Sequence, residues 1–319
     1  MRISRRSFLF ASAPVLALGL RGTASGQTVV ERGRFSSDDL PLAREQVLEF
    51  INTERAATGL NTLQLDELAC RVAGEHALDM ATHRFLSHSG SDGLKPYHRY
   101  SFAGGIDAVQ ENVSRADYIP SLTPHGVSED LRDMHLAMFD ELPPDDGHRQ
   151  CILAPQHTHL GIGIALSGDS LRLVELFVGR YLQLDPVRRT AKGSASVHLS
   201  GKLLDARHFL HGVDVFFEAM PTPPGIEWLR TPRPYSMPED RVTLRPRAPA
   251  GTTYQDGSKG DYEWSRKGTF RVPVKLFKNA PGVYTIMFWI RRTPAEKAFP
   301  AGEICLRCNS GTSFDISTS

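Results

Sequence analysis

The sequence of 319 residues lacks a charge excess and lacks any long apolar run. Its 37 basic and 36 acidic side chains leave a formal net charge of +1, which argues against a dedicated nucleic-acid-binding protein because such proteins carry a basic surplus. No apolar run reaches the roughly 18 residues that a transmembrane helix needs. With 40% hydrophobic and 23% charged residues, the composition is globular, and at about 150 residues per domain the length favours two domains.

Cysteine is scarce as well. The four cysteines are Cys70, Cys151, Cys305 and Cys308. Because there is no second CxxC pair, a four-cysteine zinc site is excluded. The residues around Cys305 and Cys308 are typical of a strand, so we expect a local structural disulfide between these two. Cys70 and Cys151 either form a second disulfide or remain buried thiols.

The N-terminus has basic residues and no acids. Arg5 and Arg6 precede a short apolar stretch, a pattern typical of a twin-arginine export signal that a receptor reads. We expect residues 1–26 to be removed by cleavage before Gln27, although a retained membrane anchor is the alternative. The mature chain is then slightly acidic, has no transmembrane span, and is placed in the periplasm or outside a bacterial cell.

After a flexible segment at residues 27–41, residues 42–184 are predicted to form an α+β domain. Apolar residues recur with helical spacing in three segments, and Asp66 is a good N-cap for the second of them. Two segments with alternating apolar residues then predict half-buried strands, so a layered domain follows. The helical segments are 43–58, 66–80 and 128–141, and the strands are 160–166 and 171–182.

The remainder of the chain is predicted to be all-β. Residues 185–193 are polar and contain helix and strand breakers, so we interpret them as a linker. Residues 194–319 contain short strand-like runs punctuated by proline and glycine, which predicts a β-sandwich domain of the immunoglobulin-like class.

Nine of the 12 histidines lie between His76 and His159, but the sequence lacks the standard HExxH, GxSxG and P-loop strings. His76 falls on the apolar face of the second helix and is interpreted as a hydrogen-bonded core residue. Glu141 falls on the apolar stripe of the third helix. A partly buried carboxylate there needs a partner such as a histidine, an arginine or a metal.

Two histidines and two glutamates stand out by their context, namely His88, Glu111, Glu141 and His148. Imidazoles and carboxylates are suitable ligands for zinc and similar divalent ions. Their separations along the chain do not define a site by themselves, and separate structural contacts are the alternative.

Five short motifs in order resemble the CAP superfamily, the SCP-like group of cysteine-rich secretory proteins, antigen 5 and pathogenesis-related group 1 proteins. The resemblance covers residues 42–184 and implies an α-β-α sandwich with a central cleft. In that family the cleft carries two histidines and two acids, and the histidines can hold zinc or another divalent ion. The motifs are Ile51–Arg55, Leu86–His88, Glu111–Val113, Gly147–Leu153 and Leu160–Gly163.

Carried onto the matching positions, the cleft residues are His88, Glu111, Glu141 and His148. The family helix often shows Trp-x-x-Glu, whereas this chain has Met138 in place of the tryptophan and Glu141 at the position of the glutamate. Asn52 and Arg55 are expected to be scaffold residues. The C-terminal half lies outside the resemblance.

Three functions follow as hypotheses. The first is an exported binding module for a lipid, a sterol, a peptide or a cell-envelope component, with a divalent metal, zinc for preference, on His88 and His148. The second is a metal-dependent hydrolase with Glu111 or Glu141 as general base. The third is a structural or adhesive extracellular protein. Because the sequence contains no recognisable nucleophile motif, we favour binding over catalysis.

Overall fold

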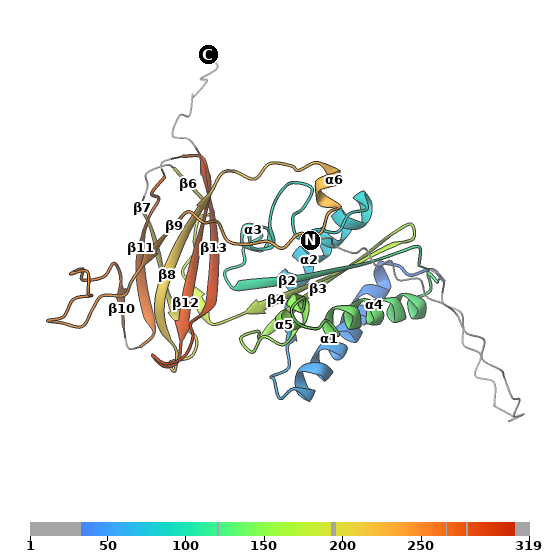
Figure 1. Cartoon of the computed structure of the whole chain (residues 1–319), viewed down its shortest axis with the longest axis horizontal. Coiled ribbons are helices and arrows are strands. Elements are labelled where there is room, and N and C mark those ends of the chain that lie inside the picture. Colours follow the sequence, from blue (N-terminus) through green and yellow to red (C-terminus); the bar gives the residue numbers. More distant parts are fainter. Residues whose placement is uncertain (1–32, 120, 193–195, 266, 279, 310–319) are drawn as a thin grey trace, which may run out of the picture. The chain divides into compact units, whose positions relative to one another are not determined.

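The computed structural model describes residues 33–119, 121–192, 196–265, 267–278 and 280–309 (Figure 1). The predicted signal peptide at 1–26 and residues 27–32 lie outside the described residues. The expectation of a flexible segment up to residue 41 is wrong for its last part. Residues Ser37–Asp39 form a 3-10 helix (η1), and α1 follows it directly. Phe35 packs against the neighbouring hydrophobic core.

The N-terminal half is a mixed α+β domain built on one four-stranded sheet. The strand order is β1-β3-β4-β2, with β1 parallel to β3 and the other pairs antiparallel. The strands are β1 (Gln64–Leu65), β2 (Ala108–Asp117), β3 (His159–Ser167) and β4 (Ser170–Gly179). The helices are α1 (Leu40–Ala57), α2 (Glu67–His83), α3 (Pro96–Phe102), α4 (Pro124–Phe139) and α5 (Gly147–Ile152).

Helices cover both faces of this sheet because β4, one of its two central strands, is apolar on both faces. Along β4, Val174 and Leu176 pack with α2, whereas Leu173 and Phe177 pack with α1 and α4. Successive side chains of a strand point to opposite faces, so one apolar run serves two cores. Figure 1 shows α2 on one side of the sheet and α1 and α4 on the other.

Helix α2 begins where the sequence predicts. The side chain of Asp66 accepts a hydrogen bond from the Ala69 backbone N–H at 2.7 Å, which caps the helix. The helix then lies directly on β3, because a Cβ atom at Gly161 or Gly163 would collide with the α2 backbone at Ala69 or Ala73. Glycine at these two strand positions therefore allows the close approach of helix and sheet.

The C-terminal half consists of two sheets that face each other across an apolar core, which agrees with the predicted all-β class. The strand orders are β10-β11-β7-β5 and β6-β13-β12-β8-β9. The immunoglobulin-like form of this class stays a prediction. The strands are β5 (Leu182–Leu184), β6 (Thr190–Lys192), β7 (Ser196–Leu203), β8 (Phe209–Glu218), β9 (Arg241–Leu244), β10 (Glu263–Trp264), β11 (Thr269–Lys275), β12 (Gly282–Arg291) and β13 (Phe299–Asn309).

The segment interpreted as a linker is partly ordered into this sandwich. Residues Thr190–Lys192 form β6, which pairs in parallel with β13, and β5 pairs with β7. The C-terminal architecture therefore begins at Leu182, earlier than the predicted boundary. The sequence pattern does not distinguish the short edge strand β6 from the polar residues that precede it.

The two halves are in direct contact. The carboxylate of Glu218, at the end of β8, accepts hydrogen bonds from Lys95 Nζ at 2.8 Å and from the Tyr97 hydroxyl at 2.9 Å. The backbone N–H of Cys305 donates to Ser101 Oγ at 2.8 Å. These contacts join α3 to the five-stranded sheet of the sandwich.

The expected disulfide between Cys305 and Cys308 is absent, and of the two alternatives for Cys70 and Cys151 the buried thiols are found. All four cysteines are buried free thiols. On β13, Cys308 faces the sandwich core and Cys305 faces the N-terminal half. Residues i and i+3 of a strand lie on opposite faces, so the CxxC spacing cannot close a bridge there. Cys70 instead accepts a hydrogen bond from the Ile162 N–H at 3.3 Å, while Cys151 is buried in α5.

Candidate functional site

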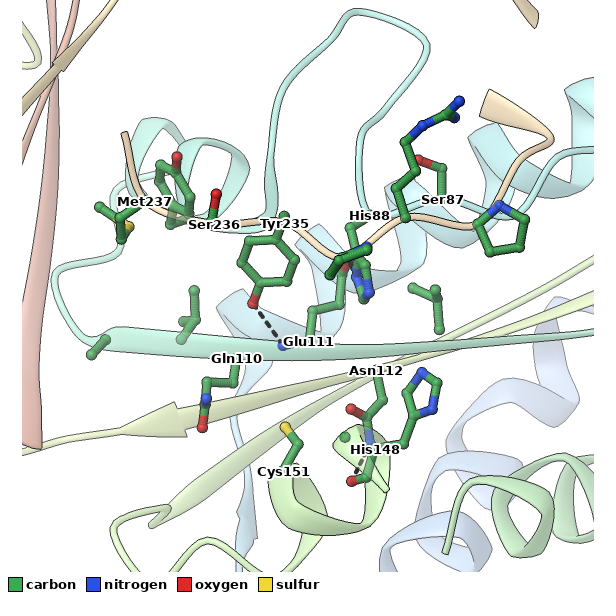
Figure 2. Close-up of a pocket in the computed structure, with 18 of the residues that line it drawn as sticks. Ser87, His88, Gln110, Glu111, Asn112, His148, Cys151, Tyr235, Ser236 and Met237 are labelled. Atoms are coloured by element: carbon green, nitrogen blue, oxygen red, sulfur yellow. Dashed lines mark hydrogen bonds and ion pairs between the residues drawn. The ribbon is translucent and has the colours of Figure 1, made fainter. Parts of the chain in front are cut away.

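The four candidate side chains line one cavity of about 760 Å³. His88 comes from the loop after α2, Glu111 from β2, Glu141 from the α4–α5 connection and His148 from α5. Figure 2 shows His88 and Glu111 on one side of β2 and His148 on the other. The sequence motifs therefore converge on one cleft at the edge of the sheet, and they form two separate histidine–glutamate pairs.

The first pair is buried and charge-compensated. His88 Nδ1 lies 3.0 Å from Glu111 Oε1, and Arg99 Nη2 donates to Glu111 Oε2 at 2.7 Å. Burial alone would raise the pKa of Glu111, but Arg99, His76 and His88 together outweigh it and lower the pKa to about 2. Glu111 is therefore a fixed carboxylate.

The second pair lies nearer to solvent. His148 Nδ1 lies 2.5 Å from Glu141 Oε1, and the His148 backbone N–H donates to Glu141 Oε2 at 3.0 Å. The prediction that Glu141 lies on the third helix is wrong, because α4 ends at Phe139. Prolines at 143 and 144 cannot continue a helix, so Glu141 sits in the connection and orients both α5 and its histidine.

His76 lies next to the first pair. Its Nε2 lies 2.8 Å from the Ser87 carbonyl oxygen and 4.0 Å from Glu111 Oε1. Burial first, and then the charge of Arg99, lowers the pKa of His76 to about 4. The prediction of a hydrogen-bonded core histidine is confirmed, although the sequence did not reveal its proximity to Glu111.

A second buried network lies behind the cleft. The Asn112 side-chain amide donates to the His148 carbonyl oxygen at 3.2 Å and to Glu175 at 3.3 Å. His135 lies between Glu175 and Glu54, at 2.7 Å from each carboxylate. Burial lowers the pKa of His135, but the two carboxylates outweigh this and raise it to about 10. Sequence reasoning missed this network, although a polar residue at a buried strand position such as Glu175 is a usable signal.

The residues expected to be scaffold do hold the domain together. Arg55 is fully buried and donates to the carbonyl oxygens of Ile152 and Ala154 at 2.6 and 3.1 Å. The Asn52 amide donates to the Leu63 carbonyl oxygen at 3.0 Å. The two Arg55 bonds fix the end of α5, which carries His148, relative to α1, whereas the Asn52 bond ties α1 to the segment before β1.

The C-terminal half supplies one wall of the cleft, which the sequence did not predict. It belongs to β12, to β13 and to the connection between β8 and β9 (residues 219–240). The lining residues from these segments are Pro232, Arg233, Pro234, Tyr235, Ser236, Met237, Met287, Trp289, Pro300 and Glu303.

This wall covers the free edge of β2. The Glu111 backbone N–H donates to the Tyr235 hydroxyl at 3.2 Å, as Figure 2 shows, and the Tyr235 ring lies 4.8 Å from the His88 ring. Further along, the Glu303 N–H donates to the Ile106 carbonyl oxygen at 2.9 Å. An uncovered edge strand exposes unpaired backbone groups, so the C-terminal half covers part of the sheet edge and completes the cleft.

The histidines suit a divalent metal in their orientation. A carboxylate on Nδ1 is the usual arrangement for a histidine that binds metal through Nε2. Both His88 and His148 have it. Across the described part of the chain, however, no group of three or more His, Cys, Asp or Glu side chains is gathered to bind a metal. The candidate donors are therefore the two imidazoles of His88 and His148, fewer than the three protein ligands typical of catalytic zinc.

Comparison with known proteins identifies the N-terminal half. The model of the CAP family, described as the cysteine-rich secretory protein family, matches residues 48–181. The uncharacterized protein YkwD of Bacillus subtilis (strain 168) is 28% identical over 126 residues, which cover 39% of this chain and 43% of that protein. The chain therefore contains a CAP domain, and its match spans less than half of that relative.

Two solved structures are also similar. An extracellular protein containing an SCP domain from Bacillus anthracis str. Ames is 20% identical, with 47% of this chain and 45% of that chain covered and a TM-score of 0.36. An outer surface protein from Borrelia burgdorferi is 17% identical, with 46% of this chain and 98% of that chain covered and a TM-score of 0.37.

Among the helices of the described residues, none has the length and apolar character to span a membrane.

Proposed function

We propose that the chain is an exported bacterial binding protein whose cleft holds an extracellular or cell-envelope ligand. The observation that carries this proposal is one cavity of about 760 Å³, within the range of small-molecule sites, lined by two carboxylate-oriented histidines. The names of the secretory family and of the extracellular and surface relatives support an exported location. The twin-arginine signal at residues 1–26 is the proposed route, with the periplasm or the cell exterior as destination.

We propose further that His88 and His148 present Nε2 to a divalent metal, with zinc as the first candidate. When bound, such an ion supplies a Lewis acid that can hold a ligand oxygen or nitrogen. The chain's own contribution is orientation, since Glu111 and Glu141 fix the two rings.

Binding accounts for the site better than hydrolysis does. A general base needs a carboxylate that is free to accept a proton. Glu111 is held by Arg99 and His88, and Glu141 is held by the ring and the backbone of His148. A structural or adhesive role would not explain why both histidine–glutamate pairs line one cavity.

Calorimetric titration of the purified full chain with zinc tests the metal proposal. We expect one zinc ion per chain and affinity reduced at least about tenfold by His88→Ala and by His148→Ala. The matched control is His125→Ala, because this α4 histidine has a side chain that is 86% exposed. Zinc affinity that is absent in the wild type, or unchanged in both cleft variants, would contradict the proposal.

A further inference from the structure

The cleft extends beyond the histidine pairs to a second end at the junction of the two halves. Here Glu303 of β13 lines the cavity, and it is only 3% exposed. Its carboxyl group receives a hydrogen bond from the Val109 backbone N–H. Its Oε1 atom is buried and has no hydrogen-bond partner in the described part of the chain. Buried polar atoms are rarely left unpaired, so this oxygen indicates a missing donor.

The surroundings of Glu303 provide no counter-charge. No ion pair reaches its carboxyl group from the described residues, and burial raises its pKa to about 8, opposed only by the Val109 hydrogen bond. Other charged side chains that line the cavity include the acids Glu141 and Asp145 and the base Arg233, and none of these three forms an ion pair with Glu303. A cationic donor from outside the chain would pair with the free oxygen and favour the ionised carboxylate, with the carboxyl proton released to solvent.

The walls around this end are aromatic and thioether groups. Tyr97 and Tyr235 have ring centroids 6.3 Å apart. Trp289 Nε1 donates to Asp214 at 2.9 Å, so its N–H is already used. Met237 and Met287 complete the lining. Aromatic faces attract cations and also pack against an alkyl chain.

We propose that the Glu303 end of the cleft binds a primary alkylammonium group carried on an aliphatic body, as in a lysine side chain or an alkylamine. The ammonium donates to Glu303 Oε1, and the aliphatic part lies against the aromatic walls. This inference rests on the proposed function in one respect, namely that the rest of the ligand occupies the same cleft.

The test compares n-hexylamine with n-hexanol, two probes of equal chain length that differ in the charged head. Their affinities for the full-length protein are measured by calorimetry, with tryptophan fluorescence as a second readout because Trp289 lines the cavity. We expect the amine to bind at least about tenfold more tightly than the alcohol, the effect of one charge-assisted hydrogen bond with a cation–π contact. Equal affinities in the wild-type protein would overturn the proposal.

Glu303→Gln is the isosteric variant, and it should lower amine affinity to that of hexanol while leaving hexanol affinity unchanged. Glu303→Met replaces it if the glutamine variant has a reduced melting temperature. Glu263→Gln is the control, because the Glu263 side chain on β10 is 76% exposed. Wild-type amine affinity in both Glu303 variants would refute the proposal. The zinc titration uses another probe and other residues, so failure of the metal site and failure of the amine site give separable results.

Discussion

Two buried glutamates near the edge of β2, Glu111 and Glu303, differ in how their carboxylate oxygens are paired. Glu111 belongs to the CAP wall of the cleft, and Arg99 and His88 hold both of its oxygens. Glu303 belongs to the C-terminal wall and has one oxygen without a partner among the described residues. Both are almost fully buried, at 5% and 3% exposure, so burial cannot account for the difference.

The difference lies in neighbouring charge. The pKa of Glu111 falls to about 2 because Arg99 and two histidines outweigh its burial, whereas the pKa of Glu303 rises to about 8 because burial acts almost unopposed. On one wall of the cleft the glutamate is therefore neutralised by neighbouring residues of the chain. The other keeps a carboxyl group with one oxygen unpaired among the described residues, for which we propose an alkylammonium partner.

Removal of Arg99 should have the largest effect on stability, because Glu111 would then be a buried carboxyl group without a cationic partner, as Glu303 is. Arg99→Met leaves a buried carboxylate without its main counter-charge, and we expect a loss of about 3–5 kcal/mol in the free energy of unfolding. Urea denaturation at pH 7 measures this loss. Arg71→Met is the control, since that arginine forms an exposed pair with Glu75. Equal denaturation midpoints for the two variants would show that Arg99 does not compensate Glu111.

The pH dependence of stability separates the two glutamates. Burial raises the folded-state pKa of Glu303 from 4.5 to about 8, so its contribution is complete below about pH 4.5 and is lost as the pH rises to 8. Integrated over that window, the wild type should lose about 2–4 kcal/mol that Glu303→Gln retains. Glu111 has a lowered pKa, so its contribution is present above pH 4.5 and is lost as the pH falls towards 2.

Urea denaturation at several pH values between 4.5 and 8.5 gives the difference between wild type and Glu303→Gln. The exposed variant Glu263→Gln should follow the wild-type curve throughout. Parallel curves for wild type and Glu303→Gln would mean that Glu303 ionises normally in the folded protein.

The CAP side of the comparison was largely predictable from sequence. His88, Glu111 and His148 each lie in a short motif that resembles the CAP family, and this resemblance, rather than their spacing along the chain, placed them in one cleft. Helix α2 and its Asp66 cap follow from local rules as well. Glu141 shows the limit of periodicity, since its position after Met138 continues a helical stripe although the helix ends at Phe139.

The C-terminal wall could not be predicted because it depends on long-range pairing. Tyr235 and Glu303 contact Glu111 and Val109 of β2, and each contact spans more than a hundred residues of sequence. Strand β13 is buried on both faces, so Glu303 and Cys305 carry no periodic signal that distinguishes the sandwich core from the domain junction. The expected disulfide between Cys305 and Cys308 was wrong because the two side chains lie on opposite faces of this strand.

The smallest expected effect concerns the contact that joins the two walls. Tyr235→Phe removes the hydroxyl that accepts the Glu111 backbone N–H while the ring stays against His88. An unpaired N–H at a covered sheet edge should cost about 1–2 kcal/mol of unfolding free energy. Tyr118→Phe is the matched control, because Tyr118 is 80% exposed. Hydrogen exchange of the Glu111 amide should also accelerate in Tyr235→Phe alone. Unchanged exchange would indicate that the C-terminal wall does not protect β2 through Tyr235, and the two walls would then be stabilised independently.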